Sequence, residues 1–440
     1  MAFPTSLLLF LLCLFLSTSS SLAKSKTKPK QIVLPIYKDA STLQYLTQIK
    51  QRTPLVPVHL TVDLGGRSLW TDCEHGYVST SIRPGGCGTI QCRLAQASKS
   101  CEPCNPEFPV GPGCTNAPTC WRFPENTVTH YASGGELASD IITINSTDGK
   151  SQGNVVALPQ FLFFCALSTI TDGLAKGVTG MAGLGRTKIS FPVQLATALK
   201  LKRKFGLCLS SSTTSNGVVI FGNGPYNFPT TWNNSSFLTY TSLIINKVNT
   251  ELRVLKGEAS AEYFIGVKSI KIRNRTVKLN TTLLQINKIG FGGTKISTVN
   301  PYTVLETSIY NAVIKAFVNE LKNVTRVPSV APFGACFSSK NIRNTRVGPA
   351  VPNIDLVMEE NGVVWRMYGA NTMVRVNKDV LCLGFVDGGE PTYINSIVIG
   401  GHQIEDNLLT FDIDKSRLGF SSSLLFRQTT CSNYRLTSNA

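Results

Sequence analysis

One aspartate, Asp63, stands in a glycine-rich segment early in the chain, residues 62–66 (Val-Asp-Leu-Gly-Gly). A later glycine-rich segment, residues 289–294, carries Gly290 where a second aspartate would stand. Two aspartates that share one proton can hydrolyse an amide bond, because the ionised carboxylate activates water while the protonated one serves the substrate carbonyl. One aspartate cannot supply both roles, so we expect Asp63 to be a structural remnant.

No other residue type in the chain replaces the missing acid. Neither Asp nor Glu occurs between Glu262 and Glu306. A zinc or redox centre is not indicated, because Cys101 and Cys104 form the only CxxC pair and the four histidines are scattered. We therefore expect a protein that is not an enzyme and that binds no metal and no cofactor.

The first 23 residues are typical of a secretory signal. An apolar run from Leu7 to Leu16 is followed by a serine-rich stretch that ends at Ala23, with small residues at the positions that a signal peptidase reads. The apolar run is too short to span a bilayer. These features predict a secreted protein without a membrane anchor.

The cysteine count fits an oxidising compartment. Of the thirteen cysteines, Cys13 lies in the signal, so twelve remain and could form six disulfides. The segment from Cys73 to Cys120 is rich in cysteine, Gly and Pro, and we expect most of the bridges to lie within it. The twelve candidates are Cys73, Cys87, Cys92, Cys101, Cys104, Cys114, Cys120, Cys165, Cys208, Cys336, Cys382 and Cys431.

The charge is strongly basic, with 43 Lys+Arg against 26 Asp+Glu and a formal net charge of +17. Nucleic acid is an improbable partner for a secreted chain, so the charge favours an acidic matrix or an acidic protein partner, with simple solubility as the alternative. Sequons for N-glycosylation also suit a secreted glycoprotein. They occur at Asn145, Asn233, Asn234, Asn274, Asn280 and Asn323.

The chain is long for a single core and contains an internal duplication. The loop of Asp63 is followed by Met181-Ala182-Gly183, and the loop of Gly290 by Val398-Ile399-Gly400. The same order of a loop and then two hydrophobic residues before a glycine predicts two related lobes. We place them at residues 24–240 and 241–440.

Short β-rich segments separated by turn residues predict a mostly β protein with few helices. Apolar spacing typical of helices packed on a sheet occurs only at residues 191–201 and 308–321. The expected strands include residues 56–62, 141–144, 217–221, 263–272, 396–399 and 408–413.

Several segments together resemble the pepsin-like family. The resemblance is stronger to its secreted plant branch of inactive homologues: extracellular dermal glycoprotein, xyloglucan-endoglucanase and xylanase inhibitors, and basic 7S globulin. It implies a bilobal pepsin-like aspartic protease fold, with Asp63 and Gly290 facing each other across a groove. The segments that carry the resemblance are 62–73, 131–140, 177–196, 290–313, 331–337 and 396–421.

The resemblance also assigns individual positions. Active members have a threonine and a serine where this chain has Leu64 and Gly66, so two hydroxyls that orient the acid pair are absent. Tyr131 stands at the position of the flap tyrosine, and we interpret it as a packed aromatic on a β-hairpin. The implied disulfides are Cys73–Cys165, Cys336–Cys382 and Cys208–Cys431.

Members of this plant branch bind microbial cell-wall glycoside hydrolases, such as endoglucanases and xylanases, and block their clefts with loops of the C-terminal lobe. Arg346 and Arg427 stand where such contacts would fall, and Arg343 is a weaker candidate. A guanidinium can engage the carboxylate pair of a glycosidase with bidentate hydrogen bonds, although a surface arginine is usually just a solvated charge. The expected protein is a monomeric inhibitor in the apoplast that acts in plant defence.

Two other functions stay open. The chain also resembles the basic globulin of legume seeds, which suggests a storage or peptide-binding protein. An atypical aspartyl hydrolase is the third possibility, and the absence of any acid from residue 263 to 305 disfavours it.

Overall fold

The computed structural model describes most of the chain after the expected signal. Residues 1–23, where the signal is expected, lie outside the described residues, as do Cys104, Cys114, Asn233 and Asn234. No helix in the described part is long and apolar enough to cross a membrane. The described residues are 29–102, 118–149, 151–224, 226, 238–250, 258–389, 395–434 and 437–438.

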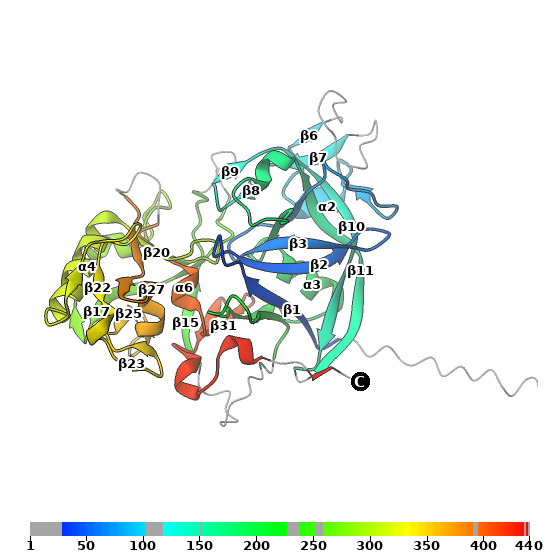
Figure 1. Cartoon of the computed structure of the whole chain (residues 1–440). Coiled ribbons are helices and arrows are strands. Elements are labelled where there is room, and N and C mark those ends of the chain that lie inside the picture. The colour runs from blue at the N-terminus through cyan, green and yellow to red at the C-terminus, as the bar shows by residue number, and fades with distance from the viewer. Residues whose placement is uncertain are drawn as a thin grey trace, which may run out of the picture.

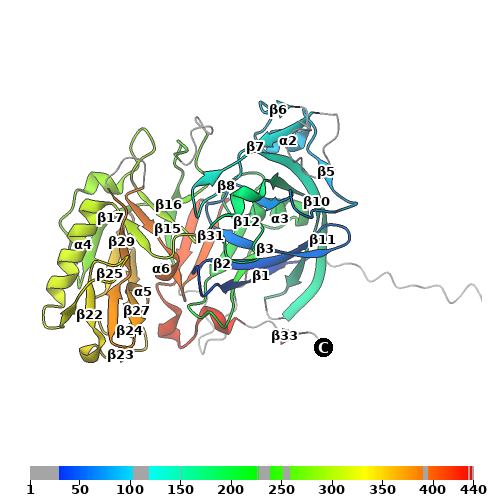
Figure 2. The same ribbon diagram turned by 45° about the horizontal axis from the view of Figure 1, so that its top comes forward.

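Strands dominate the structure and helices make up 15% of it, which confirms the mostly β fold class. Figures 1 and 2 show two bodies side by side, one built from the blue to green part of the chain and the other from the yellow and orange part. Strands from the carboxyl-terminal end lie between the two bodies (Figure 1). A lobe boundary at residue 240 stays a prediction.

The first body is a highly curved, mostly antiparallel sheet with two parallel pairings, β3 with β12 and β4 with β11. Its longest hairpin joins two strands of 13 and 16 residues, β10 and β11. Side chains on β3 are buried toward its carboxyl end, where Asp63 is the last residue of the strand. The strands are β1 (Gln31–Lys38), β2 (Tyr45–Gln51), β3 (Val56–Asp63), β4 (Leu69–Asp72), β5 (Arg83–Pro84), β6 (Cys101–Glu102), β7 (Thr119–Arg122), β8 (Glu125–Asn126), β9 (Tyr131–Ala132), β10 (Gly135–Thr147), β11 (Ser151–Ala166), β12 (Gly180–Gly183), β13 (Lys204–Cys208) and β14 (Gly217–Phe221).

The second body contains shorter strands in several sheets. Ile270 and Ile272 of β17 are buried with Lys271 between them less buried, as expected for a strand with one face on the core. The strands are β16 (Tyr263–Ile265), β17 (Val267–Ile272), β18 (Arg275–Thr276), β19 (Thr294–Ile296), β20 (Thr303–Leu305), β21 (Arg326–Val327), β22 (Cys336–Ser338), β23 (Asn344–Thr345), β24 (Gly348–Pro349), β25 (Ile354–Met358), β26 (Val364–Met367), β27 (Met373–Asn377), β28 (Val380–Leu383), β29 (Phe385–Asp387) and β30 (Ile397–Ile399).

Strands from the end of the chain connect the two bodies. β31 (Leu408–Asp412) pairs antiparallel with β13, and β32 (Arg417–Phe420) pairs with β15 (Thr239–Ile244). β33 (Thr437–Ser438) adds a short parallel pairing with β11. The carboxyl-terminal segment therefore adds strands to a sheet that begins at β1, and β31 pairs with a strand about two hundred residues earlier in the chain.

Two parallel strand pairs repeat the same arrangement in the two bodies. In the first, β12 lies parallel to β3, with Gly183 opposite Asp63. In the second, β30 lies parallel to β19, with Ile399 opposite Ile296. This repeat agrees with the duplication in the sequence, and it fixes which residues are equivalent in the two bodies.

The helices are short and pack on the sheets. α4 begins at a cap in which the Glu306 carboxylate accepts from the amides of Ser308 and Ile309, and it buries Ile309, Val313 and Phe317 on one face. The helices are α2 (Ile90–Leu94), α3 (Phe191–Leu199), α4 (Thr307–Glu320), α5 (Gly369–Thr372) and α6 (Gly401–Ile404), and the short 3-10 turns are η1 (Ser168–Thr171), η4 (Thr281–Leu284), η5 (Ser339–Asn341), η6 (Leu424–Arg427) and η7 (Cys431–Asn433).

Buried aromatic rings form the junction between the bodies. Phe205 on β13 stacks on Phe411 of β31 at 4.9 Å, and Tyr263 on β16 lies 4.7 Å from Phe411. The Tyr263 hydroxyl donates to the Leu184 carbonyl at 2.9 Å. Because these side chains are fully buried, the junction is part of one continuous core rather than a loose contact between domains.

A buried ionic network ties the first two strands to the segment after α6. The Glu405 carboxylate accepts from Lys38 Nζ at 2.6 Å and from the Tyr45 hydroxyl at 2.7 Å, and it lies 3.2 Å from His402 Nδ1. Burial alone would raise the pKa of Glu405, but the contacts with His402 and Lys38 outweigh it and lower that pKa. The network therefore holds a charged carboxylate inside the junction.

Five disulfides join the ten described cysteines. Cys73–Cys165, Cys208–Cys431 and Cys336–Cys382 are the pairings that the resemblance implied. Cys87–Cys101 and Cys92–Cys120 staple the loop region. Only these two lie wholly within residues 73–120, so the expectation that most bridges would do so is wrong for the described part of the chain.

The described sequons differ in their surroundings. Asn145 lies within β10, opposite Val33 of β1 and Val155 of β11. Asn274 is exposed in the turn between β17 and β18, and Asn280 and Asn323 are exposed as well. Glycosylation of any of them stays a prediction.

Candidate functional site

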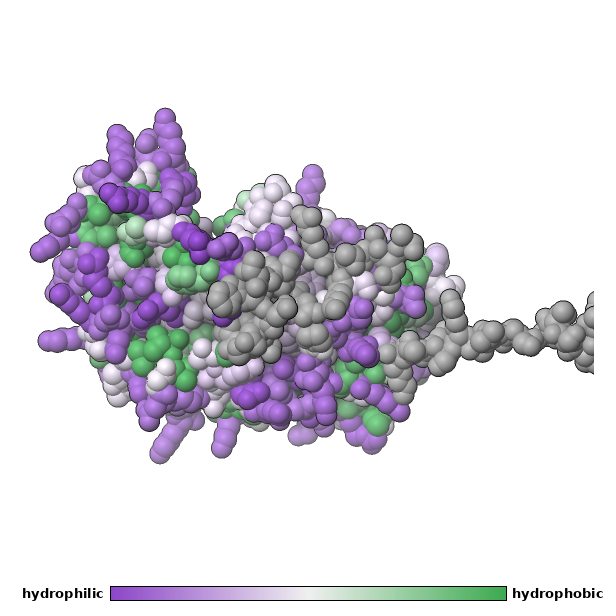
Figure 3. Space-filling model, turned by 90° about the horizontal axis from the view of Figure 1, so that it is seen from below, coloured by the Kyte–Doolittle hydropathy of each residue, from purple (hydrophilic) through white to green (hydrophobic). Residues whose placement is uncertain are grey.

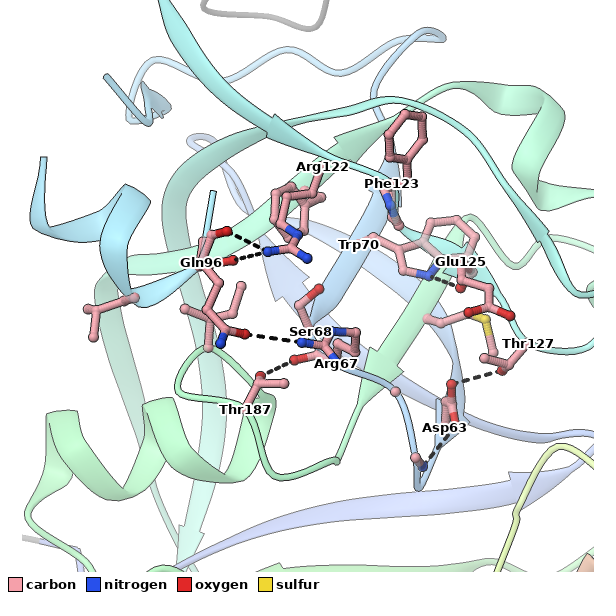
Figure 4. Close-up of a pocket in the computed structure, with 18 residues that line it drawn as sticks. Asp63, Arg67, Ser68, Trp70, Gln96, Arg122, Phe123, Glu125, Thr127 and Thr187 are labelled. Carbon is pink, nitrogen blue, oxygen red and sulfur yellow. Dashed lines mark hydrogen bonds between the residues drawn. The ribbon is translucent and has the colours of Figure 1, made fainter. Parts of the chain in front are cut away.

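Asp63 lies at the carboxyl end of β3 and is 4% exposed. The Gly65 amide donates to its Oδ1 at 3.0 Å, and the Thr127 hydroxyl donates to its Oδ2 at 2.8 Å. Figure 4 shows Thr127 and Asp63 pointing toward each other. Since Thr127 belongs to the hairpin of β8 and β9, that hairpin lies directly over the aspartate.

Burial raises the pKa of Asp63 to about 6. The Thr127 hydroxyl opposes this rise because it stabilises the ionised form, while the nearby charge of Glu262 adds to it. A carboxyl group with this pKa is protonated in mildly acidic solution. Asp63 is therefore a buried structural acid whose charge depends on pH.

The residue that meets the Asp63 loop across the junction is Thr298, not Gly290. The Thr298 hydroxyl donates to the Val62 carbonyl at 2.6 Å and accepts from the Leu64 amide at 2.9 Å. Thr298 follows Ser297, which continues β19 and donates its amide to the Ile399 carbonyl. Ser297 is thus the counterpart of Asp63, and the expected pairing of Asp63 with Gly290 is wrong.

Gly290 belongs instead to a turn that precedes β19. Its amide donates to the Asn287 carbonyl at 3.0 Å, and its own carbonyl accepts from Asn246 Nδ2 at 2.8 Å. The φ angle of Gly290 is +87°, which favours glycine. The misassignment arose because the two glycine patterns look alike, whereas Asp63 ends its strand and Gly290 comes before one.

Ser297 supplies no carboxylate, so the acid pair is absent even in the corrected alignment. Its hydroxyl accepts from the amides of Val299 at 3.2 Å and Asn300 at 3.3 Å, which fixes the following turn. A serine rather than a glycine therefore stands where a second acid would be needed for hydrolysis.

Leu64 and Gly66 stand where active family members have hydroxyl side chains, and the surroundings of the two residues differ. Leu64 is fully buried in the core, so the hydrogen bond that a threonine would make from this side is lost. Gly66 lies against Asp63, where a Cβ atom would be 2.8 Å from Oδ2. Thr127 supplies a hydroxyl to Asp63 from the hairpin instead.

A second carboxylate that the sequence did not single out lies close to Asp63. Glu262, just before β16, forms an ion pair with Lys295 of β19, and its side chain packs over Gly65. Lys295 neutralises Glu262, so this arrangement differs from two acids that share one proton. The sequence contained one indication of this residue, because Glu262 is the last acid before the stretch without Asp or Glu.

Glu258 bridges Arg67 and Arg122 near this site. Its carboxylate pairs with Arg122 Nη2 at 2.8 Å and with the Arg67 guanidinium. The space that remains beside it is a cavity of about 40 Å³, and that between Asp63 and Lys295 is about 30 Å³. Cavities of this size hold a few water molecules.

Tyr131, at the flap position, is not the packed aromatic residue that we expected. Tyr131 lies on the β8–β9 hairpin, as expected, but its side chain is 52% exposed. Thr127 and the Trp70 indole hold the hairpin in place, the indole by donating to the Glu125 carbonyl at 3.0 Å (Figure 4). Tyr131 is therefore a surface residue rather than a core residue.

Metal-binding groups are few in the described part of the chain. Three of the cysteines that lie close together are already in disulfides. Asp72, Glu74 and His75 also lie close together, but Glu74 accepts hydrogen bonds from the Ser168 amide at 2.9 Å and hydroxyl at 2.6 Å. This cluster is explained by its role in fixing the loop after β11.

Arg346 lies at the tip of the β23–β24 hairpin and is exposed. The hairpin rests on α5, where the Ala370 amide donates to the Val347 carbonyl at 2.8 Å. Arg343 is exposed at the base of the same hairpin. The sequence predicted a loop at Arg343 and Arg346, but it did not indicate that helix α5 lies beneath that loop.

Arg427 is the last residue of η6 and is half-buried. The residue before it, Phe426, packs edge-on against Tyr368 at 4.6 Å, and Tyr368 immediately precedes α5. Figures 1 and 2 both show the red carboxyl-terminal turns close to β23 at the lower edge of the molecule. The structure thus places the two arginine-bearing segments on neighbouring supports, on the side away from the β8–β9 hairpin (Figure 1).

Comparisons with known proteins match nearly the whole described chain. A family described as "Xylanase inhibitor N-terminal" matches residues 45–223, and "Xylanase inhibitor C-terminal" matches residues 262–422. Probable aspartic proteinase GIP2 of Nicotiana benthamiana is 58% identical over 433 residues, which are 98% of each chain.

Solved structures show the same likeness. The crystal structure of edgp is 56% identical, covers 93% of this chain and 99% of its own, and superposes with a TM-score of 0.89. Conglutin gamma, a basic 7S globulin from lupine seeds, is 38% identical, covers 94% of this chain and 100% of its own, and has a TM-score of 0.81.

Asp63→Asn should raise the free energy of unfolding at pH 7.5 and leave it unchanged at pH 3.5. The folded-state pKa of about 6 lies above the ordinary aspartate value of 3.8, so the stability contributed by protonated Asp63 is complete below 3.8 and is lost as pH rises through 6. Asparagine keeps the neutral form, which predicts a gain of about 1–3 kcal/mol at pH 7.5. Chemical denaturation at both pH values measures this gain.

The matched control for that experiment is Asp172→Asn, because Asp172 is exposed. It should show no pH-dependent gain. An equal gain at both pH values for Asp63→Asn would contradict the role of its charge.

Thr298→Val should destabilise the junction, because it leaves the buried Val62 carbonyl and Leu64 amide without their partner. We expect a loss of about 2–4 kcal/mol in the free energy of unfolding. Thr298→Ser keeps the hydroxyl and should lose much less. Equal stability of the valine and serine variants in denaturant titrations would show that these hydrogen bonds do not hold the loops together.

Proposed function

The chain belongs to the xylanase-inhibitor family of pepsin-like proteins, and on this premise we propose that it is a secreted, catalytically inactive inhibitor of microbial cell-wall glycoside hydrolases that acts in plant defence. Membership of this family also means that the mostly β fold is the pepsin-like fold. The observation that carries the proposal is the placement of Arg346 and Arg427 on adjoining rigid supports.

The support beneath Arg427 is firmly anchored. Cys431 is bonded to Cys208, and its amide donates to Asp406 Oδ1 at 2.9 Å. The Leu424 amide donates to the Asp406 carbonyl at 2.8 Å, which fixes the other end of the turn. A segment held at both ends loses little entropy when a partner binds.

The chemistry of the two arginines suits a glycosidase cleft. Such a cleft carries a pair of carboxylates, and a planar guanidinium can form two parallel hydrogen bonds with one of them. The formal net charge of +17 favours an encounter with an acidic partner. The proposed partner is therefore an endoglucanase, xyloglucanase or xylanase, with binding through the C-terminal lobe.

Several features of the groove support the absence of protease activity. Ser297 replaces the second acid, Lys295 neutralises Glu262, and Glu258 bridges Arg67 and Arg122. The protein scaffold is thereby available for binding through its loops, as in the proposed inhibitor.

A second candidate is a seed globulin or peptide-binding protein. The 38% identity to conglutin gamma, a basic 7S globulin from lupine seeds, favours it. Accumulation in seeds without inhibition of any fungal xyloglucanase or xylanase would support this candidate against the first.

The double variant Arg346→Ala/Arg427→Ala should abolish inhibition of a susceptible fungal endoglucanase or xylanase. Each single alanine variant should cost about 2 kcal/mol or more of binding free energy, because a buried charge on the enzyme loses its partner. Lysine should rescue only in part, since an ammonium cannot form the bidentate contact. The inhibition constant of each variant, measured against a panel of such enzymes, gives these values.

Arg375→Ala is the control, because Arg375 is an exposed arginine on β27 with no proposed contact. It should inhibit as the unaltered protein does. Full potency of the double variant would place the inhibitory surface elsewhere.

Neither the natural protein nor Ser297→Asp should cleave a denatured protein substrate at acidic pH. Active members have a threonine at the position of Leu64, and its hydroxyl orients the acid pair. Leu64 has no hydroxyl, so the introduced acid would be misplaced, and misplaced catalytic groups lose most of the advantage of preorganisation. Proteolysis is measured by release of soluble peptides. Cleavage that disappears on Asp63→Ala would refute the assignment as a non-enzyme.

A further inference from the structure

A large aromatic side chain stands on the surface next to Arg427. Phe426 is 50% exposed, although its neighbour Leu424 in the same turn is fully buried. Figure 3, which views the molecule from below, shows hydrophobic patches within a mostly hydrophilic surface. Single exposed apolar residues are common on protein surfaces, and what distinguishes Phe426 is the support that fixes its ring.

The ring of Phe426 is fixed rather than free to turn. It packs edge-on against Tyr368 with ring centroids 4.6 Å apart and an interplanar angle of 74°, a favourable geometry for an aromatic pair. Arg366 hydrogen bonds to Tyr368 and forms a bidentate pair with Asp355 at 2.8 and 2.7 Å. The exposed ring therefore rests on a chain of contacts that ends on a buried carboxylate.

The same support extends to the hairpin of Arg346. The Tyr368 carbonyl accepts from the amides of Asn371 and Thr372 at the start of α5, and Ala370 in that helix donates to Val347 beside Arg346. Tyr368 thus links the turn that carries Arg427 to the helix that carries the Arg346 hairpin. Together they form an arginine–aromatic–arginine surface, defined by Arg346, Tyr368, Phe426 and Arg427.

We propose that Phe426, backed by Tyr368, is an apolar anchor that enters a sugar-binding subsite of the target hydrolase, next to the catalytic carboxylates engaged by the arginines. This inference rests on the proposed function and adds a residue to it. Aromatic side chains, phenylalanine among them, and arginine are both enriched in the buried centres of protein interfaces. A flat ring also matches a subsite built to hold the apolar face of a pyranose ring.

The charge of the surface selects this occupant over a second copy of the chain. Arg427 follows Phe426 directly in the chain, the hairpin of Arg346 rests on the same helix α5, and a protein of net charge +17 repels its own copy. A concave cleft with carboxylates at its base complements both the charge and the protruding ring.

The test compares inhibition constants against the fungal xyloglucanases and xylanases of the panel. Phe426→Ala should raise the inhibition constant at least about ten-fold, as expected for an interface anchor, whereas Phe426→Tyr keeps the ring and should stay within about three-fold. Ile289→Ala is the matched control, because Ile289 is a 61% exposed apolar residue in a different loop. It should have no effect, and unchanged melting temperatures should show that all variants are folded.

The outcomes separate this inference from the proposed function. If Phe426→Ala inhibits as well as the unaltered protein while Arg346→Ala and Arg427→Ala do not, the arginine contacts stand and the aromatic anchor is refuted. If Phe426→Ala is unstable, equal potency of Phe426→Tyr and a further Phe426→Ser variant would refute it in the same way. If the unaltered protein inhibits no hydrolase in the panel, the proposed function fails and the anchor fails with it.

Discussion

The Thr298 hydroxyl is the contact on which the centre of the molecule depends. It accepts from the Leu64 amide and donates to the Val62 carbonyl, and so joins the end of β3 to the strand end of the second body. Both groups are buried, where an unpaired amide or carbonyl is costly. The burial of Asp63 and the packing of Tyr263 and Phe411 all require the two strand ends to stay together at this point.

Loss of the second acid changed what this junction can do. A catalytic site of this kind needs water beside two carboxylates, whereas here Glu258 pairs with Arg67 and Arg122, and Glu262 pairs with Lys295 near Asp63. These ion pairs add to the rigidity of the molecule. Loops that are held by a rigid body would bind a partner with a smaller entropy cost.

The sequence predicted the fold better than the site. Strands such as β3 and β14, and helices α3 and α4, follow from hydrophobic spacing and lie close to the expected ranges. The counterpart of Asp63 was misplaced because glycine patterns were matched instead of strand ends. Contacts such as Thr127 with Asp63, or Tyr368 with Phe426, join residues far apart in the chain, so no local pattern could reveal them.

The pairing of β13 with β31 also sets an order of events during synthesis. β13 ends at residue 208, and its partner begins at residue 408, so the edge of the sheet stays unpaired until the ribosome has added about two hundred more residues. At roughly 5–20 residues per second, this interval lasts about 10–40 seconds. During that time this edge of the sheet presents unpaired amides and carbonyls, which are open to pairing with another strand.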